Sequence, residues 1–253
     1  MGRNGKSKLY GKGSHTETDL KYGRSELDRK VICIPEEDHL TSTNNRNDLF
    51  LASLEGKTID ITAVSIDIVD SSTKVQTLSN EDAGAYYQTF IENTSDLIQE
   101  CGGYVLKNVG DCVIGFFPCS KYYTENHDKA VLCGLTLRDM IKDSLGPYFI
   151  SRKLPSIACR VSADYGAAAV IRIRSNGDYS AIDLFGGAMN SVARILHNAM
   201  PNQMVIGDSL FWRLPREDFD FKIVNRWDLS GKWSYPVYVV ERRKHANGGS
   251  EYE

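Results

Sequence analysis

The sequence predicts an α+β fold of the ferredoxin-like type, in which an antiparallel sheet carries helices on one face. Three observations lead to this prediction: a strand of alternating apolar residues at 57–69, a hairpin around Gly110-Asp111, and two amphipathic helices that separate the strands. The order along the chain is strand, helix, strand, strand, helix, strand, with further elements after it. Folds of this type host many activities, so function has to be argued from particular residues.

The first half of the domain has clear element boundaries. The segment KTIDITAVSIDIV alternates and is rich in Ile and Val, which predicts a strand. Ser79 is expected to cap the next helix, because Asp82 follows at the capping-box spacing. Apolar residues then recur at helical spacing until Gly102-Gly103, where the helix should end. YVLKNV and CVIGFFP predict two short strands around the Gly110-Asp111 turn.

The second half is predicted to contain two more helices and several strands. HDKAVLCGLTLRDMIKDSLG is amphipathic and predicts a second helix, and LPSIACRVSADYG and AAAVIRIRS predict two separate strands. DLFGGAMNSVARILHNA predicts a third helix, with Asp183 as a possible N-cap. QMVIGDSLF predicts a short strand, and DFKIVNRWDL with YPVYVVERR predicts a hairpin at a sheet edge.

The composition of the chain predicts its domain organisation and limits the kinds of partner that are expected. The 253 residues are 42% hydrophobic and carry a net charge of −3, so neither nucleic acid nor a membrane is expected as the main partner. No apolar run is long enough for stable membrane insertion and the N-terminus lacks an apolar signal core, which favours a cytoplasmic protein. We place a partly disordered polar extension at 1–48, a globular domain at 57–242 and a flexible tail at 243–253.

The six cysteines do not suggest a metal site or a disulfide framework. None of them forms a C-x-x-C pair, and most lie in apolar segments such as DCVIGFF and AVLCGL. Buried, reduced thiols are therefore expected.

Two aspartates are the first candidates for chemistry. Asp67 lies at the end of the first predicted strand and Asp111 lies in the turn between the second and third. The first and third strands of a ferredoxin-like sheet are central neighbours, so these carboxylates could meet and would then need a cation between them. Oxygen ligands, with the carbonyl of Ile68 as a further donor, suit Mg²⁺ or Mn²⁺. Taken singly, each aspartate is better explained as a turn residue, because Asp is a standard turn former.

Three segments, SIDIVDSS, KNVGD and DLFGGAMNSVARI, resemble the signature segments of class III nucleotidyl cyclases, the catalytic domain of adenylate and guanylate cyclases. The resemblance covers essentially the whole predicted domain. The intervals from Asp67 to Asp111, and from Asp183 through Asn190 to Arg194, also match the family. One such segment is weak support, whereas three in order at matching separations are specific.

The resemblance implies a reaction that uses two metal ions. The family's counterparts of Asp67 and Asp111 bind two divalent ions, Mn²⁺ or Mg²⁺, and a nucleoside triphosphate becomes a 3′,5′-cyclic mononucleotide and pyrophosphate. The counterpart of Asn190 orients the ribose, and the counterpart of Arg194 neutralises charge on the α-phosphate. These two residues share one helix face because of their i, i+4 spacing.

The resemblance also implies a base-contacting pair. Lys107 and Asp183 match the pair that contacts the base in adenylate cyclases, although Lys107 could be a surface lysine of a strand. One donor and one acceptor suit adenine and uracil alike, so the pair does not choose between ATP and UTP. The family often has Gly-Phe-Thr where this chain has Asp70-Ser71-Ser72. The family also commonly has a lysine that binds phosphate, and Lys232 is the nearest candidate for it in this chain.

In the family, one subunit supplies the metal aspartates and the other supplies the remaining residues, which implies a head-to-tail homodimer. A single cyclase domain with a short polar extension resembles the pyrimidine cyclases of bacterial anti-phage Pycsar systems, whose product activates a separate effector protein. We therefore expect conversion of UTP to cUMP. An adenylate cyclase and a non-catalytic nucleotide-binding module are the alternatives; a diguanylate cyclase lacks support because no GGDEF-type segment is present.

Overall fold

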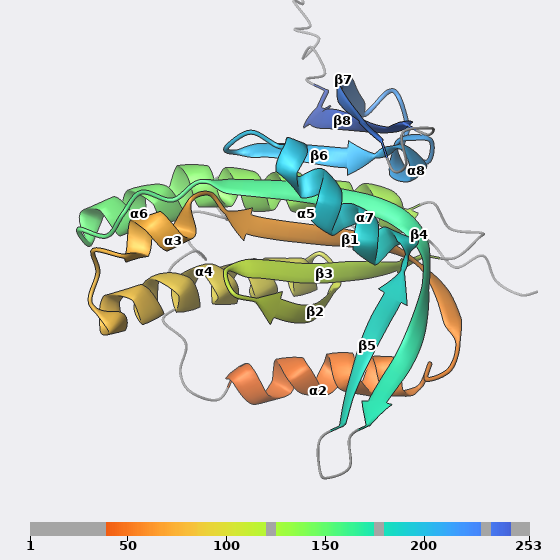
Figure 1. Cartoon of the computed structure of the whole chain (residues 1–253), viewed down its shortest axis with the longest axis horizontal. Helices are drawn as coiled ribbons and strands as arrows, with labels where there is room; N and C mark the ends of the chain where they lie inside the picture. Colours follow the sequence, from red (N-terminus) through yellow and green to blue (C-terminus); the bar gives the residue numbers. More distant parts are fainter. Residues whose placement is uncertain (1–38, 120–124, 175–179, 229–233, 244–253) are drawn as a thin grey trace, which may run out of the picture.

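The computed structural model describes residues 39–119, 125–174, 180–228 and 234–243 (Figure 1). Within these residues the sheet has eight strands in the order β2-β3-β1-β4-β6-β8-β7, with β5 paired to β4. The strands are β1 (Thr58–Ile68), β2 (Tyr104–Val109), β3 (Cys112–Cys119), β4 (Cys159–Arg174), β5 (Ser180–Gly186), β6 (Gln203–Gly207), β7 (Phe219–Asp228) and β8 (Ser234–Arg242).

The helices alternate with these strands as the ferredoxin-like pattern requires. The unit β1-α4-β2-β3-α5-β4 gives the sheet order β2-β3-β1-β4, so the predicted fold class is confirmed. The helical segments are α2 (His39–Ala52), α3 (Ser71–Val75), α4 (Asn80–Glu100), α5 (Glu125–Met140), the π-helix η1 (Ile141–Leu145), α6 (Gly146–Ser151), α7 (Gly187–Ile195), the 3₁₀-helix η2 (Leu196–Asn198) and α8 (Asp208–Phe211).

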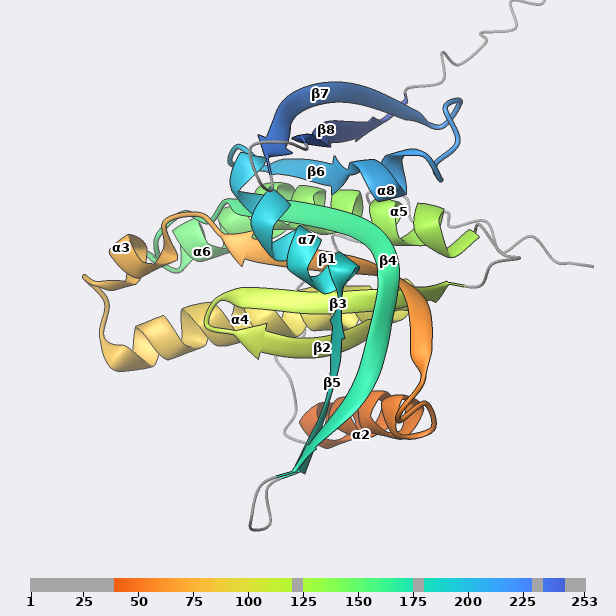
Figure 2. The ribbon, with the colours of Figure 1, turned by 45° about the vertical axis from the view of Figure 1, so that its right-hand side comes forward.

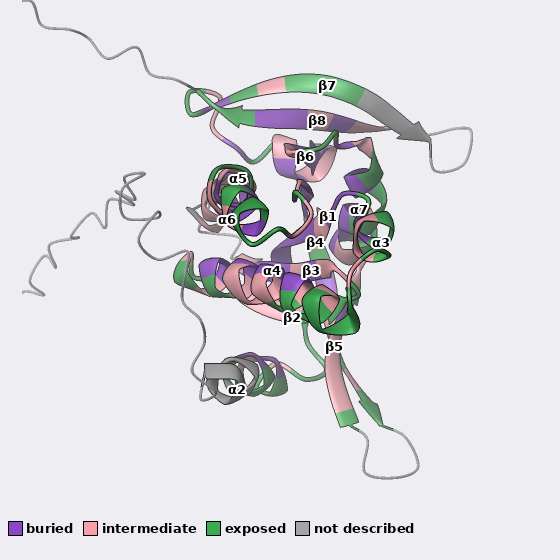
Figure 3. Ribbon diagram, turned by 90° about the vertical axis from the view of Figure 1, so that its left-hand side faces the viewer, coloured by how far each residue is buried: buried purple, intermediate pink, exposed green. Residues whose placement is uncertain are grey.

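Helices cover both faces of the sheet, rather than only the one face that was predicted (Figure 3). Alternate residues of β1 point to opposite faces. Val64 and Ile66 pack in the core that contains α4 and α5, the two helices predicted on one face. Ile61 and Ala63 pack instead with α7 and α2 in a second core. Seven of the eleven β1 residues are therefore buried, among them all six from Ile61 to Ile66.

Local signals in the first half of the domain are confirmed. The N–H of Asp82 donates to Ser79 Oγ over 3.0 Å at the start of α4. The helix ends at Glu100, and Gly102 adopts a left-handed conformation with φ of 84° that favours glycine. Among the five cysteines in the described part of the chain, Cys133 and Cys159 are buried as expected, whereas Cys101, Cys112 and Cys119 are only partly buried; Cys33 lies outside this part.

Two predictions for the second half are wrong. The two strands predicted around Tyr165-Gly166 form the single strand β4, in which Gly166 allows close approach of α7: a Cβ there would lie 3.2 Å from the Ala188 nitrogen. Asp183 is not an N-cap, because DLFG belongs to β5 and Asp183 pairs with Ile171 of β4. The helix α7 begins only at Gly187. Pairing with the long β4 overrides the local helical pattern.

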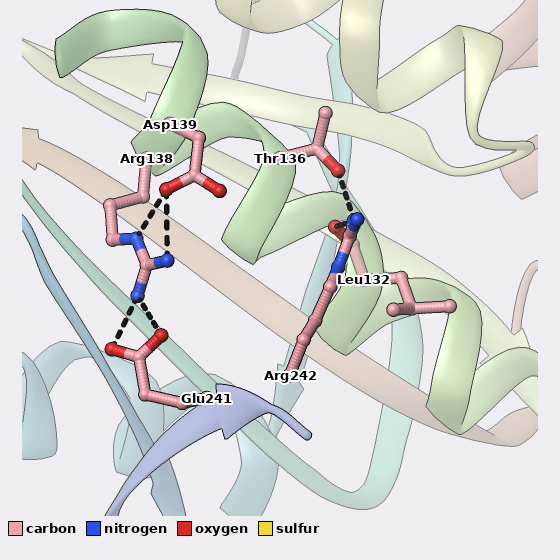
Figure 4. Close-up of polar contacts among 6 residues, drawn as sticks. All are labelled: Leu132, Thr136, Arg138, Asp139, Glu241 and Arg242. Atoms are coloured by element: carbon pink, nitrogen blue, oxygen red, sulfur yellow. Dashed lines mark hydrogen bonds and ion pairs between the residues drawn. The ribbon is translucent and has the colours of Figure 1, made fainter. Parts of the chain in front are cut away.

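The predicted hairpin of β7 and β8 lies at the sheet edge and is tied to α5 by polar contacts (Figure 4). Arg138 donates from Nη1 to both carboxylate oxygens of Glu241, at 2.6 and 2.7 Å. Arg242 donates from Nη2 to Thr136 Oγ1 over 2.6 Å and to the Leu132 carbonyl over 3.3 Å. These contacts join the last strand to a helix more than a hundred residues earlier.

The ends of the chain are described only in part. Residues 39–48 of the predicted extension form the first part of α2, whereas 1–38 and the tail at 244–253 lie outside the described residues. None of the helices in the described part combines the length and apolar character that a membrane span requires.

A buried aspartate joins β4, α8 and β8. Asp164 is 1% exposed, and its carboxylate accepts hydrogen bonds from the Tyr235 hydroxyl over 2.6 Å and from the N–H groups of Tyr165 and Leu210. Any side chain at Gly207 would collide with this carboxylate. Burial raises the pKa of Asp164 from 3.8 to about 6, although its hydrogen bonds act in the opposite direction.

We predict that protonation of Asp164 stabilises the folded state. The wild type should therefore gain stability on acidification relative to the Asp164→Asn variant, whose side chain does not titrate. Because the pKa is raised on folding, protonation favours the folded state; this contribution is complete below pH 3.8 and is lost as pH rises through about 6. The unfolding free energy of the wild type, relative to Asp164→Asn, should therefore increase on acidification from pH 7 to 4.5, by about 2 kcal/mol. Denaturant titrations measure this difference, and a pH-independent difference would contradict the prediction.

Candidate metal and nucleotide site

The structure brings Asp67 and Asp111 together. Asp67 is the penultimate residue of β1, and Asp111 follows Gly110 in the tight turn between β2 and β3. The strands β1 and β3 pair with Ile66 opposite Val113, so the end of β1 lies beside the start of β3. The two aspartate side chains therefore lie close enough for the charge of Asp111 to act on Asp67.

The two carboxylates repel each other, and a cation bound between them would remove this repulsion. Burial and then the charge of Asp111 raise the pKa of Asp67 to about 6, while Arg160 and His197 act to lower it. The residues therefore fit a divalent ion: two adjacent carboxylates with the carbonyl of Ile68 beside them. Among the described residues no group of three or more His, Cys, Asp or Glu side chains could hold a metal, so further ligands would have to be water or substrate oxygens.

Sequence reasoning missed two cationic residues beside this pair. Arg160 lies directly opposite Asp67 in the β1–β4 ladder, and its Nε is buried with no hydrogen-bond partner among the described residues. His197, at the exposed surface of η2, is close enough for its charge to lower the pKa of Asp67. A charged residue inside the apolar strand segment IACRV was the available signal for Arg160. For His197 the sequence offered no signal, because its proximity depends on how α7 packs.

The turn after β1 explains a departure from the family pattern. Asp70 adopts φ 55° and ψ 34°, in the left-handed region, and α3 starts at the next residue. Glycine adopts this conformation at little cost, and Asp tolerates it better than most other residues. The backbone of the turn therefore has the shape that the family's glycine favours, with an added carboxylate.

Lys107 and Asp183 also meet, in a second cluster. Lys107 lies on β2 and Asp183 on β5, and their side chains form an ion pair. The lysine side chain is 41% exposed and the aspartate side chain 16%. Asp183 Oδ1 accepts a further hydrogen bond from the N–H of Leu184 over 2.8 Å. The pair presents a donor and an acceptor at the surface, and its contact with a base remains a prediction.

The third predicted group lies on the outer face of α7. Ala188 and Val192 bury the inner face of this helix, and Ser162 Oγ donates to the Val192 carbonyl over 2.8 Å. Asn190 and Arg194 are exposed on the opposite side of the helix. Their roles toward ribose and phosphate remain predictions, and Lys232 lies outside the described residues.

The comparisons with known proteins bear on the fold. No protein-family model matches the sequence. A uridylate cyclase from Burkholderia cepacia is 26% identical over 207 residues, or 79% of this chain and 88% of that protein. The adenylyl cyclase CyaB from P. aeruginosa superposes with a TM-score of 0.68, at 16% identity, over 75% of this chain and 97% of its own. The chain has the fold of a class III nucleotidyl cyclase domain.

A second solved structure supports the same assignment of the fold. The guanylate cyclase domain of RhGC from Catenaria anguillulae, in complex with GTP, matches with a TM-score of 0.64 and 19% identity. The match covers 74% of this chain and 100% of that domain. The resemblance inferred from three short segments is thereby confirmed, and the cyclase fold places Asp67, Lys107 and Arg194 on different elements of one domain.

We predict that Asp111→Asn stabilises the metal-free domain and removes its response to divalent ions. The substitution keeps the shape of the side chain but removes the like charge beside Asp67. The melting temperature in a chelator should rise by about 2–4 °C, corresponding to roughly 1 kcal/mol, and added Mn²⁺ should no longer increase it.

Asp220→Asn is the matched control for this substitution. It breaks an exposed ion pair with Arg243 at the sheet edge and should leave the Mn²⁺ response unchanged. An Asp111→Asn variant that keeps the full Mn²⁺-induced rise would contradict the assignment of Asp111 as a ligand.

Proposed function

We propose that this chain is a nucleotidyl cyclase, a phosphorus–oxygen lyase that converts a nucleoside triphosphate into a 3′,5′-cyclic mononucleotide and pyrophosphate. The observation that carries the proposal is the proximity of Asp67 and Asp111, which lie at adjoining ends of the neighbouring central strands β1 and β3 of a cyclase fold. Two like charges held together at strand ends are unfavourable by themselves, and a divalent ion makes them favourable.

In this proposal Asp67, Asp111 and the carbonyl of Ile68 hold two divalent ions, Mn²⁺ or Mg²⁺. When bound, the ions supply charge neutralisation at the triphosphate and acidify the 3′-hydroxyl. The 3′-oxygen forms a bond to the α-phosphorus, the bond from this phosphorus to the β-phosphate bridge breaks, and the hydroxyl proton passes to water. Arg160, with its half-buried guanidinium beside Asp67, is placed to attract the triphosphate.

Asn190 and Arg194 complete the proposed reaction. The amide of Asn190 orients the ribose, and the planar guanidinium of Arg194 matches the charge that develops on the α-phosphate. Because both side chains are exposed on the outer face of α7, a partner subunit can receive them. We therefore propose a head-to-tail homodimer with two sites at its interface.

The arm formed by β4 and β5 supports the dimer. Ile171 and Ile173 alternate along one face of β4, where Phe185 of β5 joins them, and all three are between 40% and 47% exposed. Asp183 lies on the same face, directly opposite Ile171. Exposed apolar side chains at this density mark an interaction surface. In this proposal a second copy of the chain covers the apolar surface. Dimer formation then brings the arm next to a nucleotide.

The proposed substrate is UTP, with cUMP as the second messenger for a separate effector in anti-phage defence. The support is the relative named as a uridylate cyclase, together with the donor and acceptor of Lys107 and Asp183, which fit uracil. ATP is the alternative substrate, because adenine offers a matching acceptor and donor.

We predict that the purified chain, offered ATP, GTP, CTP and UTP separately with Mn²⁺, forms a cyclic product most rapidly from UTP. Asp67→Ala, Asp111→Ala and Arg194→Ala should each lower turnover by at least about a hundredfold while the far-ultraviolet circular dichroism stays unchanged. Chromatography with mass spectrometry identifies the product.

Asp220→Ala serves as the control, because this aspartate is exposed at the far edge of the sheet and should keep wild-type turnover. Product from ATP alone would replace the uridylate assignment with the adenylate one. A chain that binds nucleotides but forms no cyclic product from any of them would be a binding module.

We predict that two inactive variants restore activity when they are mixed. In a head-to-tail dimer, Asp67→Ala and Arg194→Ala subunits combine into one intact and one doubly defective site. Refolding the two together should recover roughly a quarter of wild-type turnover, since half of the dimers are mixed. Recovery should disappear when both substitutions are placed on the same chain, and no recovery in the mixture would exclude shared sites.

A further inference from the structure

A one-residue bulge in β2 decides which way Lys107 points. Val105 pairs with Gly115, but Lys107 pairs with Ile114, so Leu106 is an extra residue in the ladder. A bulge of this kind shifts every later side chain to the other face of the sheet.

Without this bulge Lys107 would lie on the wrong face. A regular ladder would place it opposite Val113, which is fully buried in the core under α4 and α5. With the bulge, it shares the face of Ile114 and Phe116, which is the α7 side of the sheet. Only on this side can it reach Asp183 of β5.

The helix α2 is bonded to the chain at the bulge. Asn47 is 6% exposed, and its side-chain amide donates to the carbonyl of Val105, the residue that precedes the extra one. The Phe50 ring stacks on Tyr104, with centroids 4.3 Å apart and planes 20° from parallel. The Arg46 guanidinium lies 4.9 Å from the centre of the Tyr104 ring. These contacts hold the segment that leads into Lys107.

The end of the same helix is bonded to the β4–β5 arm, which runs toward α2 in Figure 2. Glu55, just after α2, accepts from Arg172 Nε over 2.7 Å and from Arg174 Nη2 over 2.9 Å. The Gly56 N–H donates to the Val170 carbonyl over 2.9 Å. Residue 171, next to these contacts, is the pairing partner of Asp183.

We propose that α2 is a positioning element for base recognition, with Asn47 as its central positioning residue. It joins the β2 bulge to the β4–β5 arm, and so sets the separation and direction of Lys107 and Asp183 without touching the nucleotide. The inference rests on the proposed function, in which this pair contacts the base. Discrimination by hydrogen bonds depends on donor and acceptor geometry, so a displaced pair loses selectivity before it loses chemistry.

Asn47→Asp tests the proposal. It keeps the side-chain shape but replaces the N–H donor with an acceptor that repels the Val105 carbonyl. The ratio of kcat/KM for the preferred nucleotide to that for the others should fall about tenfold, mainly through KM, because the metal aspartates lie elsewhere. Amide hydrogen exchange across residues 104–109 should also increase.

Asn93→Asp is the matched control, because Asn93 likewise donates from its amide to a backbone carbonyl, that of Thr89, but on α4. It should leave selectivity and exchange in β2 unchanged. If Asn47→Asp fails to fold, Glu55→Gln releases the arm from the exposed end of α2, with Asp220→Asn as its control. It is expected to lower selectivity in the same direction.

The outcomes separate this inference from the proposed function. If the wild type cyclises a nucleotide and folded Asn47→Asp and Glu55→Gln keep its selectivity and KM, the positioning role of α2 is overturned and the cyclase stands. If the variants lose stability but keep selectivity, α2 is only structural and the inference is again overturned. A wild type that forms no cyclic product overturns the proposed function and the base-reading role together, and hydrogen exchange then still reports whether Asn47 fixes the bulge.

Discussion

The pairing of β1 with β3 at the centre of the sheet is the constraint on which the candidate site depends. It places the end of β1 beside the turn that precedes β3, so that Asp67 and Asp111 lie close together. Both strands are fixed by apolar side chains on two faces, and neither can slide without exposing them. The sheet therefore holds two like charges together rigidly, which is the arrangement that a divalent ion requires.

The two faces of the sheet differ in the residues they carry. The α4–α5 face is closed and apolar, and it contains most of the large core residues. The α7 face carries the polar groups: Asn190 and Arg194 outside, and the Lys107–Asp183 pair at the arm. Because these groups lie on separate elements, their relative positions depend on how α2, α7 and the arm pack.

The parts of the fold that could be predicted were those with local causes. The Ser79 cap, the alternating strand β1 and the turn at Gly110-Asp111 have short-range physical reasons, and each was predicted correctly. The long β4 and the strand at Asp183 were missed, because a glycine and a helix-like spacing were given local meanings. Their conformation depends instead on pairing between residues distant in the chain.

The sequence by itself determined the strand β1, the Ser79 cap and the turn at Gly110-Asp111, because their causes lie within short stretches of chain. Its acidic, basic and amide residues also carried the resemblance to the class III cyclases. Only the tertiary structure decided that Arg160 and His197 lie beside Asp67, and that a bulge turns Lys107 toward Asp183. Such relations arise across strands and between helix and sheet. Their energies come from contacts that no short stretch of sequence contains.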